Sequence, residues 1–207
     1  MSFLVELKRL SEPAGGVKPS FDAYHAYLAL LSLYQEAPMG RLALSKKLVL
    51  GEASVKTLIK RMRSRGLIDV DRVAGIFLTR EGLELVENLS KVLDFIGRLD
   101  ISGVCANCEA YGVVIKKFRE VLAEKIGYLK LRDQVVREGA EGAIIVYCGE
   151  TPVMPVSGGF EKAGGVLKDI ALKHCIEGDV LAMSICYNNR GICARALVNA
   201  VLKILDP

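Results

Sequence analysis

The chain has 207 residues, of which 51% are apolar, and its formal net charge is +4. This apolar content can fill one medium or two small cores, so the composition excludes a disordered chain and a disulfide mini-scaffold. Mean hydropathy is high at +0.31, yet the purest apolar runs, such as residues 143–148, are far shorter than the roughly 20 residues of a membrane-spanning helix. The hydropathy therefore indicates buried cores rather than a membrane protein. The first ten residues lack the apolar segment of a signal peptide, which predicts a cytoplasmic location.

Positive charge is concentrated in one stretch of the chain. Between residues 41 and 80, ten Lys and Arg residues accompany three Asp and Glu residues, a local charge of +7. The rest of the chain has 18 basic and 21 acidic residues, a charge of −3. A surface with this excess either contacts the phosphates of a nucleic acid or is the solvated face of a helix.

Residues 1–20 are predicted to form an N-terminal arm, because two Pro and two Gly residues interrupt them. A helix is then predicted between Phe21 and Pro38, where apolar residues repeat at intervals of three and four. Ser20 or Asp22 is the expected N-cap of this helix.

Two more helices follow, a short one over residues 41–48 and a longer one that ends at Gly66. The longer helix has an apolar face at positions i, i+3, i+4 and i+7: Val55, Leu58, Ile59 and Met62. A basic stripe follows the same period on its other side: Lys56, Lys60 and Arg63. The pattern predicts a helix that buries one face and presents a cationic one.

Two short strands, at residues 67–72 and 75–78, are predicted next, with a tight turn between them. Thr79 is the expected cap of a long final helix, whose apolar seam runs from Val86 to Ile96. The order helix, helix, helix, hairpin, helix over residues 21–99 predicts a winged helix-turn-helix, the first domain of an α+β chain.

Four short segments together resemble winged-helix transcription regulators: Leu44–Leu48, Gly51–Ile59, Gly66–Ile68 and Leu78–Gly82. The resemblance implies that the helix before Gly66-Leu67-Ile68 enters the DNA major groove, and that Leu-Thr-x-x-Gly closes the wing. The alternative is a winged helix that contacts another protein, because a fold does not fix a function.

The expected partner is double-stranded DNA, since a helix fits the major groove and basic residues beside it neutralise phosphates. Hydrogen-bonding residues in the first half of the third helix are expected to meet bases: Ser54, Lys56, Thr57 and Lys60. Flanking residues are expected to hold the DNA backbone: Lys46, Lys47, Arg61, Arg63 and Arg72.

Residues 100–207 are predicted to form a second domain, a two-layer α/β sandwich with a mixed or antiparallel sheet. Strands are expected at 101–106, 110–116, 143–148, 151–156 and 179–187, and helices at 118–138, 162–174 and 190–205. The last helix is apolar almost all round except for a stripe of Arg195, Asn199 and Lys203. Such a helix needs two neighbours, which predicts a homodimer or packing against the 86–96 seam within one chain.

The stretch 131–143, together with Met154-Pro155 and Pro19-Ser20-Phe21-Asp22, resembles an archaeal family of uncharacterised winged-helix proteins. The C-terminal domain of that family resembles the small two-layer domain inserted in some aminoacyl-tRNA synthetases. The resemblance implies a transcription regulator whose second domain dimerises or senses a small effector, and it implies no cofactor.

Two pairs of residues are candidate effector contacts, Arg132 with Asp133 and Gly158 with Gly159. The charged pair can instead be an ordinary ion pair on a helix surface. The glycines can hold an anion through backbone N–H groups, or they form a flexible connection.

Cys105 and Cys108 form a Cys-x-x-Cys motif. Two thiolates at this spacing make half of a zinc site, which another cysteine or His174 would complete, or a redox disulfide. No second such motif is present, so the interpretation adopted is plain thiols and no metal. Few glutamines hint at a thermophilic source, in which the rule against intracellular disulfides is weaker.

No catalytic residues are predicted. The second half of the chain has one histidine, and it has no nucleophile, acid and base at a spacing that is typical of a particular reaction. The expectation is a regulator and not an enzyme. The competing hypotheses are an enzyme with its chemistry in residues 101–207 and an adaptor that binds protein or RNA.

Overall fold

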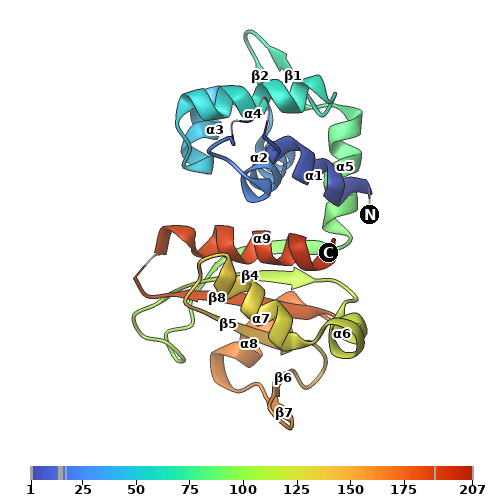
Figure 1. The fold of residues 1–207 in the computed structure, drawn as a ribbon, viewed down its shortest axis with the longest axis vertical. Coiled ribbons are helices and arrows are strands. Elements are labelled where there is room, and N and C mark those ends of the chain that lie inside the picture. Colours follow the sequence, from blue (N-terminus) through green and yellow to red (C-terminus); the bar gives the residue numbers. More distant parts are fainter. Residues whose placement is uncertain (1, 14–15, 17, 189, 207) are drawn as a thin grey trace. The chain divides into compact units, whose positions relative to one another are not determined.

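The computed structural model describes residues 2–13, 16, 18–188 and 190–206. The chain divides into two compact units, one of residues up to Ser90 and one from Lys91 to Leu205 (Figure 1). Each unit has its own core of buried apolar side chains. Within the described ranges, no helix combines the length and the apolar character that a membrane crossing requires.

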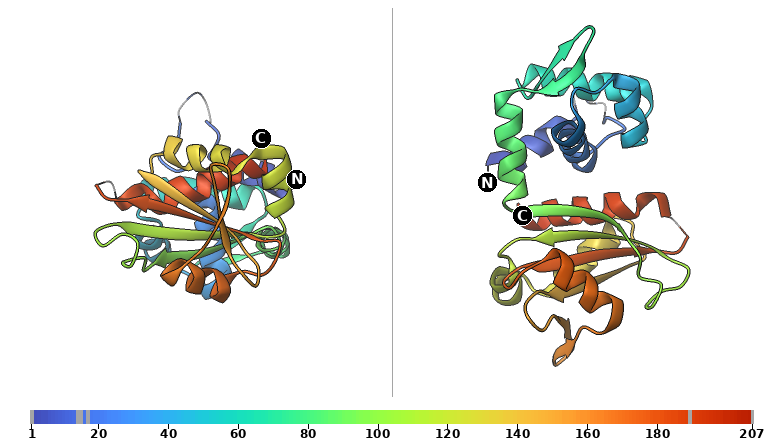
Figure 2. Two further views of the ribbon diagram at one scale, coloured as in Figure 1. Left: turned by 90° about the horizontal axis from the view of Figure 1, so that it is seen from below. Right: turned by 180° about the vertical axis from the view of Figure 1, so that it is seen from behind.

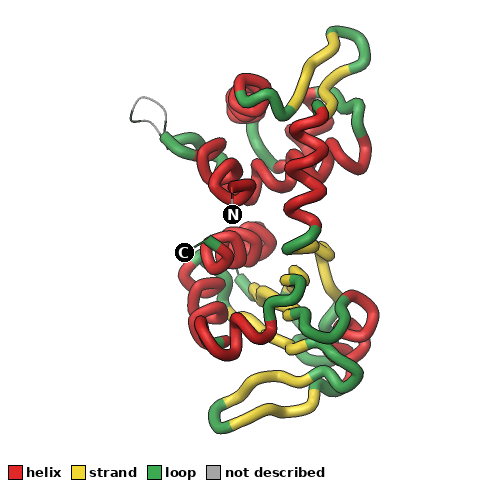
Figure 3. The backbone as a smooth tube through the Cα atoms, turned by 90° about the vertical axis from the view of Figure 1, so that its right-hand side faces the viewer, coloured by secondary structure: helices red, strands yellow, loops and turns green. Residues whose placement is uncertain are grey.

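The N-terminal unit contains the expected order of three helices, a hairpin and a further helix, preceded by an additional helix. Its elements are α1 (Ser2–Ser11), α2 (Ala23–Glu36), α3 (Arg41–Leu48), α4 (Glu52–Ser64), β1 (Ile68–Asp71), β2 (Gly75–Leu78) and α5 (Arg80–Ser90). In the tube view the β1–β2 hairpin extends beyond the helices of this unit (Figure 3).

The N-terminal arm predicted over residues 1–20 begins with a packed helix, α1. Leu4, Leu7 and Leu10 are buried at three-residue spacing, and α1 contacts α2, α4 and α5. The prediction rested on the Pro and Gly residues, which all lie between residues 13 and 19. Residues 2–11, which precede them, have the amphipathic pattern of a helix. Residues 14, 15 and 17 of the expected arm lie outside the described residues.

Local hydrogen bonds set the ends of α2 and α5. Of the two caps predicted for α2, Asp22 fills the position: its Oδ1 accepts the His25 amide at 3.4 Å. Thr79 caps α5 as predicted, because its Oγ1 accepts the Gly82 amide at 3.2 Å, and its hydroxyl also donates to the Gly66 carbonyl. A Cβ on Gly82 would lie 2.0 Å from the Leu67 carbonyl oxygen, so only glycine fits there.

The hairpin is tied to the end of α2. β1 and β2 pair antiparallel from Ile68 opposite Leu78 to Asp71 opposite Gly75. Met39, which follows the end of α2, exchanges two backbone hydrogen bonds of 2.9 Å with Ile76 on β2. The hairpin is therefore held by a third segment of extended chain.

The predicted long helix through Ile96 is wrong. Helix α5 ends at Ser90, and β3 (Leu93–Leu99) is instead an edge strand of the second unit, paired antiparallel with β4 (Glu109–Ile115). Leu89 and Leu93 satisfy the helical spacing, but six residue pairs with β4, on either side of a bulge between Phe95 and Gly97, outweigh it. Residues 91–99 thus belong to the C-terminal unit.

The remaining elements of the C-terminal unit surround the sheet. They are α6 (Arg119–Val121), a π-helical turn (Leu122–Ile126), α7 (Tyr128–Arg137), β5 (Gly142–Tyr147), β6 (Val153–Val156), β7 (Gly159–Lys162), α8 (Gly165–His174), β8 (Val180–Cys186), a 3-10 turn (Arg190–Ile192) and α9 (Cys193–Leu205). The strand order is β3-β4-β8-β5-β6-β7, and every pairing is antiparallel, which confirms one of the two expected sheet types.

Three local predictions in this unit are wrong. Residues 101–106 form turns instead of a strand, Gly127 at φ +87° breaks the helix expected over 118–138, and 159–162 is the unexpected strand β7. The first and third depend on which chain segment lies alongside, which no local pattern encodes.

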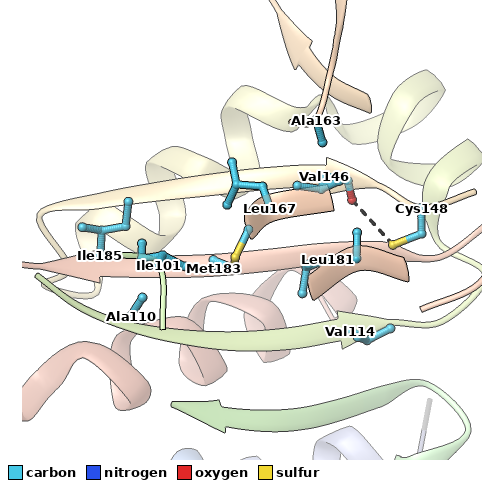
Figure 4. Close-up of a cluster of buried hydrophobic side chains, with 11 residues drawn as sticks. Ile101, Ala110, Val114, Val146, Cys148, Ala163, Leu167, Leu181, Met183 and Ile185 are labelled. Carbon is cyan, nitrogen blue, oxygen red and sulfur yellow. Dashed lines mark hydrogen bonds between the residues drawn. The ribbon is translucent and has the colours of Figure 1, made fainter. Parts of the chain in front are cut away.

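The sheet carries helices on both faces, so the expected two layers are three (Figure 2). Leu181, Met183 and other apolar side chains face α8 in one buried cluster (Figure 4). On the other face, the Ser184 hydroxyl donates to the Cys193 carbonyl on α9 at 3.0 Å, and α9 contacts α7, β3, β4 and β8. Successive residues of β8 thus serve opposite cores.

Helix α9 is buried almost all round, as its sequence suggested. Arg195 and Lys203 are exposed, whereas Asn199, the third residue of the expected polar stripe, is buried. The continuous helix over 86–96, proposed as its second neighbour within the chain, does not exist because that stretch divides into α5 and β3.

Candidate nucleic-acid interface

Helix α4 has the two faces that its sequence predicted. Val55, Leu58 and Met62 have no exposed surface, and Ile59 is half-buried. Lys56, Lys60 and Arg63 are exposed at the same spacing on the other side. The apolar face anchors the helix in the core and leaves a cationic face accessible.

Carboxylates neutralise two of the cations expected to contact DNA. Lys47 forms an ion pair with Glu36, and Arg63 Nη2 lies 3.3 Å from Asp69 Oδ1. All four side chains are well exposed, so these pairs contribute little to stability, but each lowers the charge available to a phosphate.

Arg61 has a role that its sequence position did not predict. Its Nη1 donates to the carbonyls of Leu10 at 2.8 Å and Glu12 at 2.6 Å, and its guanidinium lies 5.3 Å from the centre of the Phe21 ring. These partners carry no charge, so Arg61 ties the segment after α1 to α4 and retains its positive charge.

Four of the expected phosphate or base contacts are open to a ligand. Lys46, Lys56, Lys60 and Arg72 are exposed, and among the residues the structure describes they have no hydrogen-bond or ion-pair partner. They come from the last turn of α3, from α4 and from the hairpin. Thr57 is exposed beside them, with its hydroxyl donating to the Ala53 carbonyl at 3.0 Å.

The tip of the hairpin is shaped by one carboxylate. Asp71 Oδ1 accepts the amides of Val73 and Ala74, both at 2.7 Å. These hydrogen bonds favour the ionised carboxylate and hold the pKa of Asp71 below its ordinary value of 3.8. The turn presents Arg72 and the Val73 side chain, which is 97% exposed, to solvent.

The connection between α3 and α4 contains a strained residue. Val49 lies in the left-handed region at φ +52° and is 88% exposed. A β-branched residue is disfavoured there because its Cβ crowds the backbone. The turn that orients α4 is therefore held by its surroundings and not by the preference of Val49.

Ser54, an expected base contact, is half-buried under a segment that precedes α2. Its hydroxyl lies 2.6 Å from that of Ser20. Pro19 to Phe21 and the first turns of α4 enclose a groove of about 360 Å³. The sequence gave Ser20 as a possible helix cap and as part of the Pro19-Ser20-Phe21-Asp22 stretch of the family resemblance, and neither indicates a contact with a residue 34 positions away.

The candidate effector residues fall in two separate places. Arg132 and Asp133 are exposed, with Nε and Oδ1 3.8 Å apart, and line a groove of about 540 Å³ between α7 and the start of β5. The rest of that groove consists of Val136, Arg137, Glu141, Gly142 and Ala143. Gly158 and Gly159 lie instead at the β6–β7 turn, so the structure does not join the two pairs into one site.

The interpretation of Cys105 and Cys108 as plain thiols is wrong, because the structure pairs these and every other cysteine of the C-terminal unit. The pairs are Cys105–Cys108, Cys148–Cys175 and Cys186–Cys193. The second joins the end of β5 to the end of α8, a proximity that only the folded sheet creates. Within the described residues, no group of three or more His, Cys, Asp or Glu side chains is placed to hold a metal ion.

Comparison with known proteins finds a solved structure that resembles the chain over most of its length. Residues 26–84 match the family model described as PH0730-like, N-terminal domain. No curated protein sequence gives a significant match. A solved structure described as regulation of DNA binding of Bordetella bronchiseptica BpsR by 6-hydroxynicotinic acid has 21% identity over 43% of this chain and 64% of that chain. Its TM-score of 0.31 does not establish a common fold. The hypothetical protein PH0730 from Pyrococcus horikoshii OT3 has 25% identity and a TM-score of 0.65, covering 88% of this chain and 94% of that chain, so this chain is similar to PH0730 in fold along most of its length.

Proposed function

We propose that the chain is a DNA-binding transcription regulator whose N-terminal unit is a winged helix-turn-helix. In this proposal α3 and α4 form the helix-turn-helix, and the β1–β2 hairpin is the wing. α4 enters the major groove, where base edges present distinct donors and acceptors. Lys46 and Arg72 contact backbone phosphates on either side.

The observation that carries the proposal is the accessible side of α4. Lys56 and Lys60 are exposed, one helical turn apart, and directly opposite side chains with no exposed surface. A solvated helix face would carry carboxylates as well as lysines, whereas the acidic residue of α4 is confined to its first position, Glu52. The exposed side of α4 is mainly cationic: Glu52, one turn before Lys56, lies 3.9 Å from Arg41 Nη2, and no acidic residue follows it in the helix. A mainly cationic face fits a polyanion.

The C-terminal unit is proposed to dimerise the chain or to bind a small effector, and not to perform catalysis. The groove beside Arg132 and Asp133 supports the effector role, because it offers basic and acidic groups next to the start of a strand. A homodimer would place two copies of α4 on adjacent half-sites of one operator.

The test is a charge reversal on α4. The double variant Lys56→Glu/Lys60→Glu should lose binding to a duplex selected from the source genome, because two attractive phosphate contacts become repulsive. Gel shift measures the loss, and circular dichroism checks that the helices are retained.

A matched control separates a local effect from a change in total charge. Lys168→Glu/Lys173→Glu makes the same charge change on exposed lysines of α8 in the other unit, and it should bind DNA nearly as the parent does. Equal binding by the α4 variant and the parent would exclude α4 as the reading helix, and binding that salt does not weaken would indicate a protein partner.

A further inference from the structure

The groove between the segment 19–21 and α4 has a lining suited to an anion. Ser20 contributes from the segment, and Ser54, Thr57 and Arg61 contribute from α4. None of the described residues that line it is Asp or Glu. Pro19 and Phe21 of the segment and Ala53 of α4 supply the apolar part of the lining.

The hydrogen-bond pattern leaves donors to spare in this groove. Ser20 and Ser54 lie 2.6 Å apart, and two hydroxyls that share one hydrogen bond retain one hydrogen to donate elsewhere. Arg61 uses Nη1 on two backbone carbonyls, so its Nε and Nη2 groups keep three N–H donors. Thr57 donates to Ala53 and can only accept further bonds.

A hydroxyl donor beside a guanidinium, with no carboxylate, is the chemistry that recognises a phosphate oxygen. The groove lies next to the exposed lysines of α4. Thr57 lines the groove, and Lys60, three residues further along the helix, is its neighbour on the helix surface. A phosphate in the groove would therefore lie next to whatever Lys60 contacts.

We propose that this groove holds a backbone phosphate of the duplex that α4 reads, an inference that rests on the proposed function. Ser20 is then a DNA contact supplied by the N-terminal segment. Ser54 donates to the Ser20 hydroxyl, which leaves the Ser20 hydrogen for the phosphate, and Ser54 does not read a base. Arg61 serves twice, because its Nη1 fixes the segment and its remaining donors meet the phosphate.

Phosphate contacts set the position of a protein on DNA without reading its sequence. Loss of the Ser20 hydroxyl should therefore weaken binding to cognate and unrelated duplexes by the same factor, about tenfold for one hydrogen bond to a charged group. The salt dependence should not change, because a neutral hydroxyl releases no counterion.

The experiment measures duplex affinity of the full chain by fluorescence anisotropy for Ser20→Ala, Ser20→Thr and Ser64→Ala. Ser20→Thr keeps the hydroxyl and should restore affinity. Ser64→Ala removes a hydroxyl at the far end of α4, one that donates to the Arg61 carbonyl at 2.9 Å, and should bind as the parent does. Thermal unfolding of each variant shows whether a loss of affinity comes from a loss of fold.

Replacing single phosphates of the duplex by neutral methylphosphonates identifies the bound group. At one position the replacement should weaken Ser20→Ala by a smaller factor than it weakens the parent, because the variant has already lost the Ser20 contact and has only the Arg61 contact left to lose. Additive losses at every position would overturn the inference, because they are the result expected if a free phosphate ion, and not the duplex, filled the groove.

The outcomes separate the two proposals. Salt-dependent binding by the parent with unchanged affinity in Ser20→Ala overturns the phosphate groove and leaves the DNA-binding function intact. Absence of duplex binding by the parent overturns both.

Discussion

The salt dependence of DNA binding tests the interface most sharply, because the structure assigns a state to each basic residue. Of the seven cations expected to contact DNA, five keep their charge: Lys46, Lys56, Lys60, Arg61 and Arg72. Lys47 and Arg63 are neutralised by Glu36 and Asp69. A cation that already has a carboxylate partner displaces no counterion from the DNA.

The magnitude follows from counterion release. At about 0.9 per neutralised phosphate, five cations give a slope of about −4.5 in log K against log salt, and seven give about −6.3. Between 50 and 200 mM salt, affinity would fall about 500-fold in the first case and about 6000-fold in the second. These values apply to one copy on one half-site.

The perturbation is the removal of the two competing carboxylates. Glu36→Gln/Asp69→Asn frees Lys47 and Arg63, so we expect tighter binding at low salt and a slope that steepens toward about −6.3. Glu161→Gln/Asp169→Asn removes the same negative charge from exposed positions of the C-terminal unit and should leave the slope unchanged.

Fluorescence anisotropy titrations at four or more salt concentrations give both slopes. A parent slope already near −6.3, or a slope that the carboxylate variant does not change, would refute the assignment of ion-paired and available cations. A slope near zero would refute electrostatic DNA binding altogether.

Three further predictions concern stability. Val49→Gly should slow hydrogen exchange of the α3 and α4 amides, because glycine relieves the left-handed strain; the gain in protection should be about 1 kcal/mol. The control Val73→Gly, at a comparably exposed position without positive φ, should not increase the protection of these amides. Because the pKa of Asp71 is lowered by the amides of its own turn, the carboxylate stabilises the hairpin above pH 3.8 and this contribution is lost as pH falls through the lowered pKa; the exposed turn amides should shift in NMR spectra only in that acid range, and a midpoint above 3.8 would contradict the geometry. Replacing Cys148 and Cys175 by alanine opens a loop with a sequence separation of 27 and should cost roughly 3.5 kcal/mol in urea denaturation of the C-terminal unit; a negligible loss would show that the two thiols are not joined.

Local patterns determined the parts of this protein whose contacts lie within a few residues. The period of α4 predicted which side chains are buried and which are exposed, because helix geometry alone places i, i+3, i+4 and i+7 on one face. The Leu-Thr-x-x-Gly motif likewise fixed the start of α5, since Thr79 caps a helix whose Gly82 must approach Leu67 closely.

The tertiary structure decided every feature that joins distant segments. Residues 93–99 have helical spacing but form a strand, because a neighbouring strand supplies partners for their backbone groups. The cysteine pair 148–175 depends in the same way on where β5 and α8 end.

The interface shows the same division. The sequence by itself placed a cationic helix near the middle of the N-terminal unit and named its lysines. It could not show that Arg61 is held by carbonyls 51 and 49 positions away, or that Ser20 lies against Ser54. Long side chains bind whichever partners the folded chain brings within reach. The sequence therefore gives the charge of each residue, but only the packing decides whether that charge is free to bind a ligand.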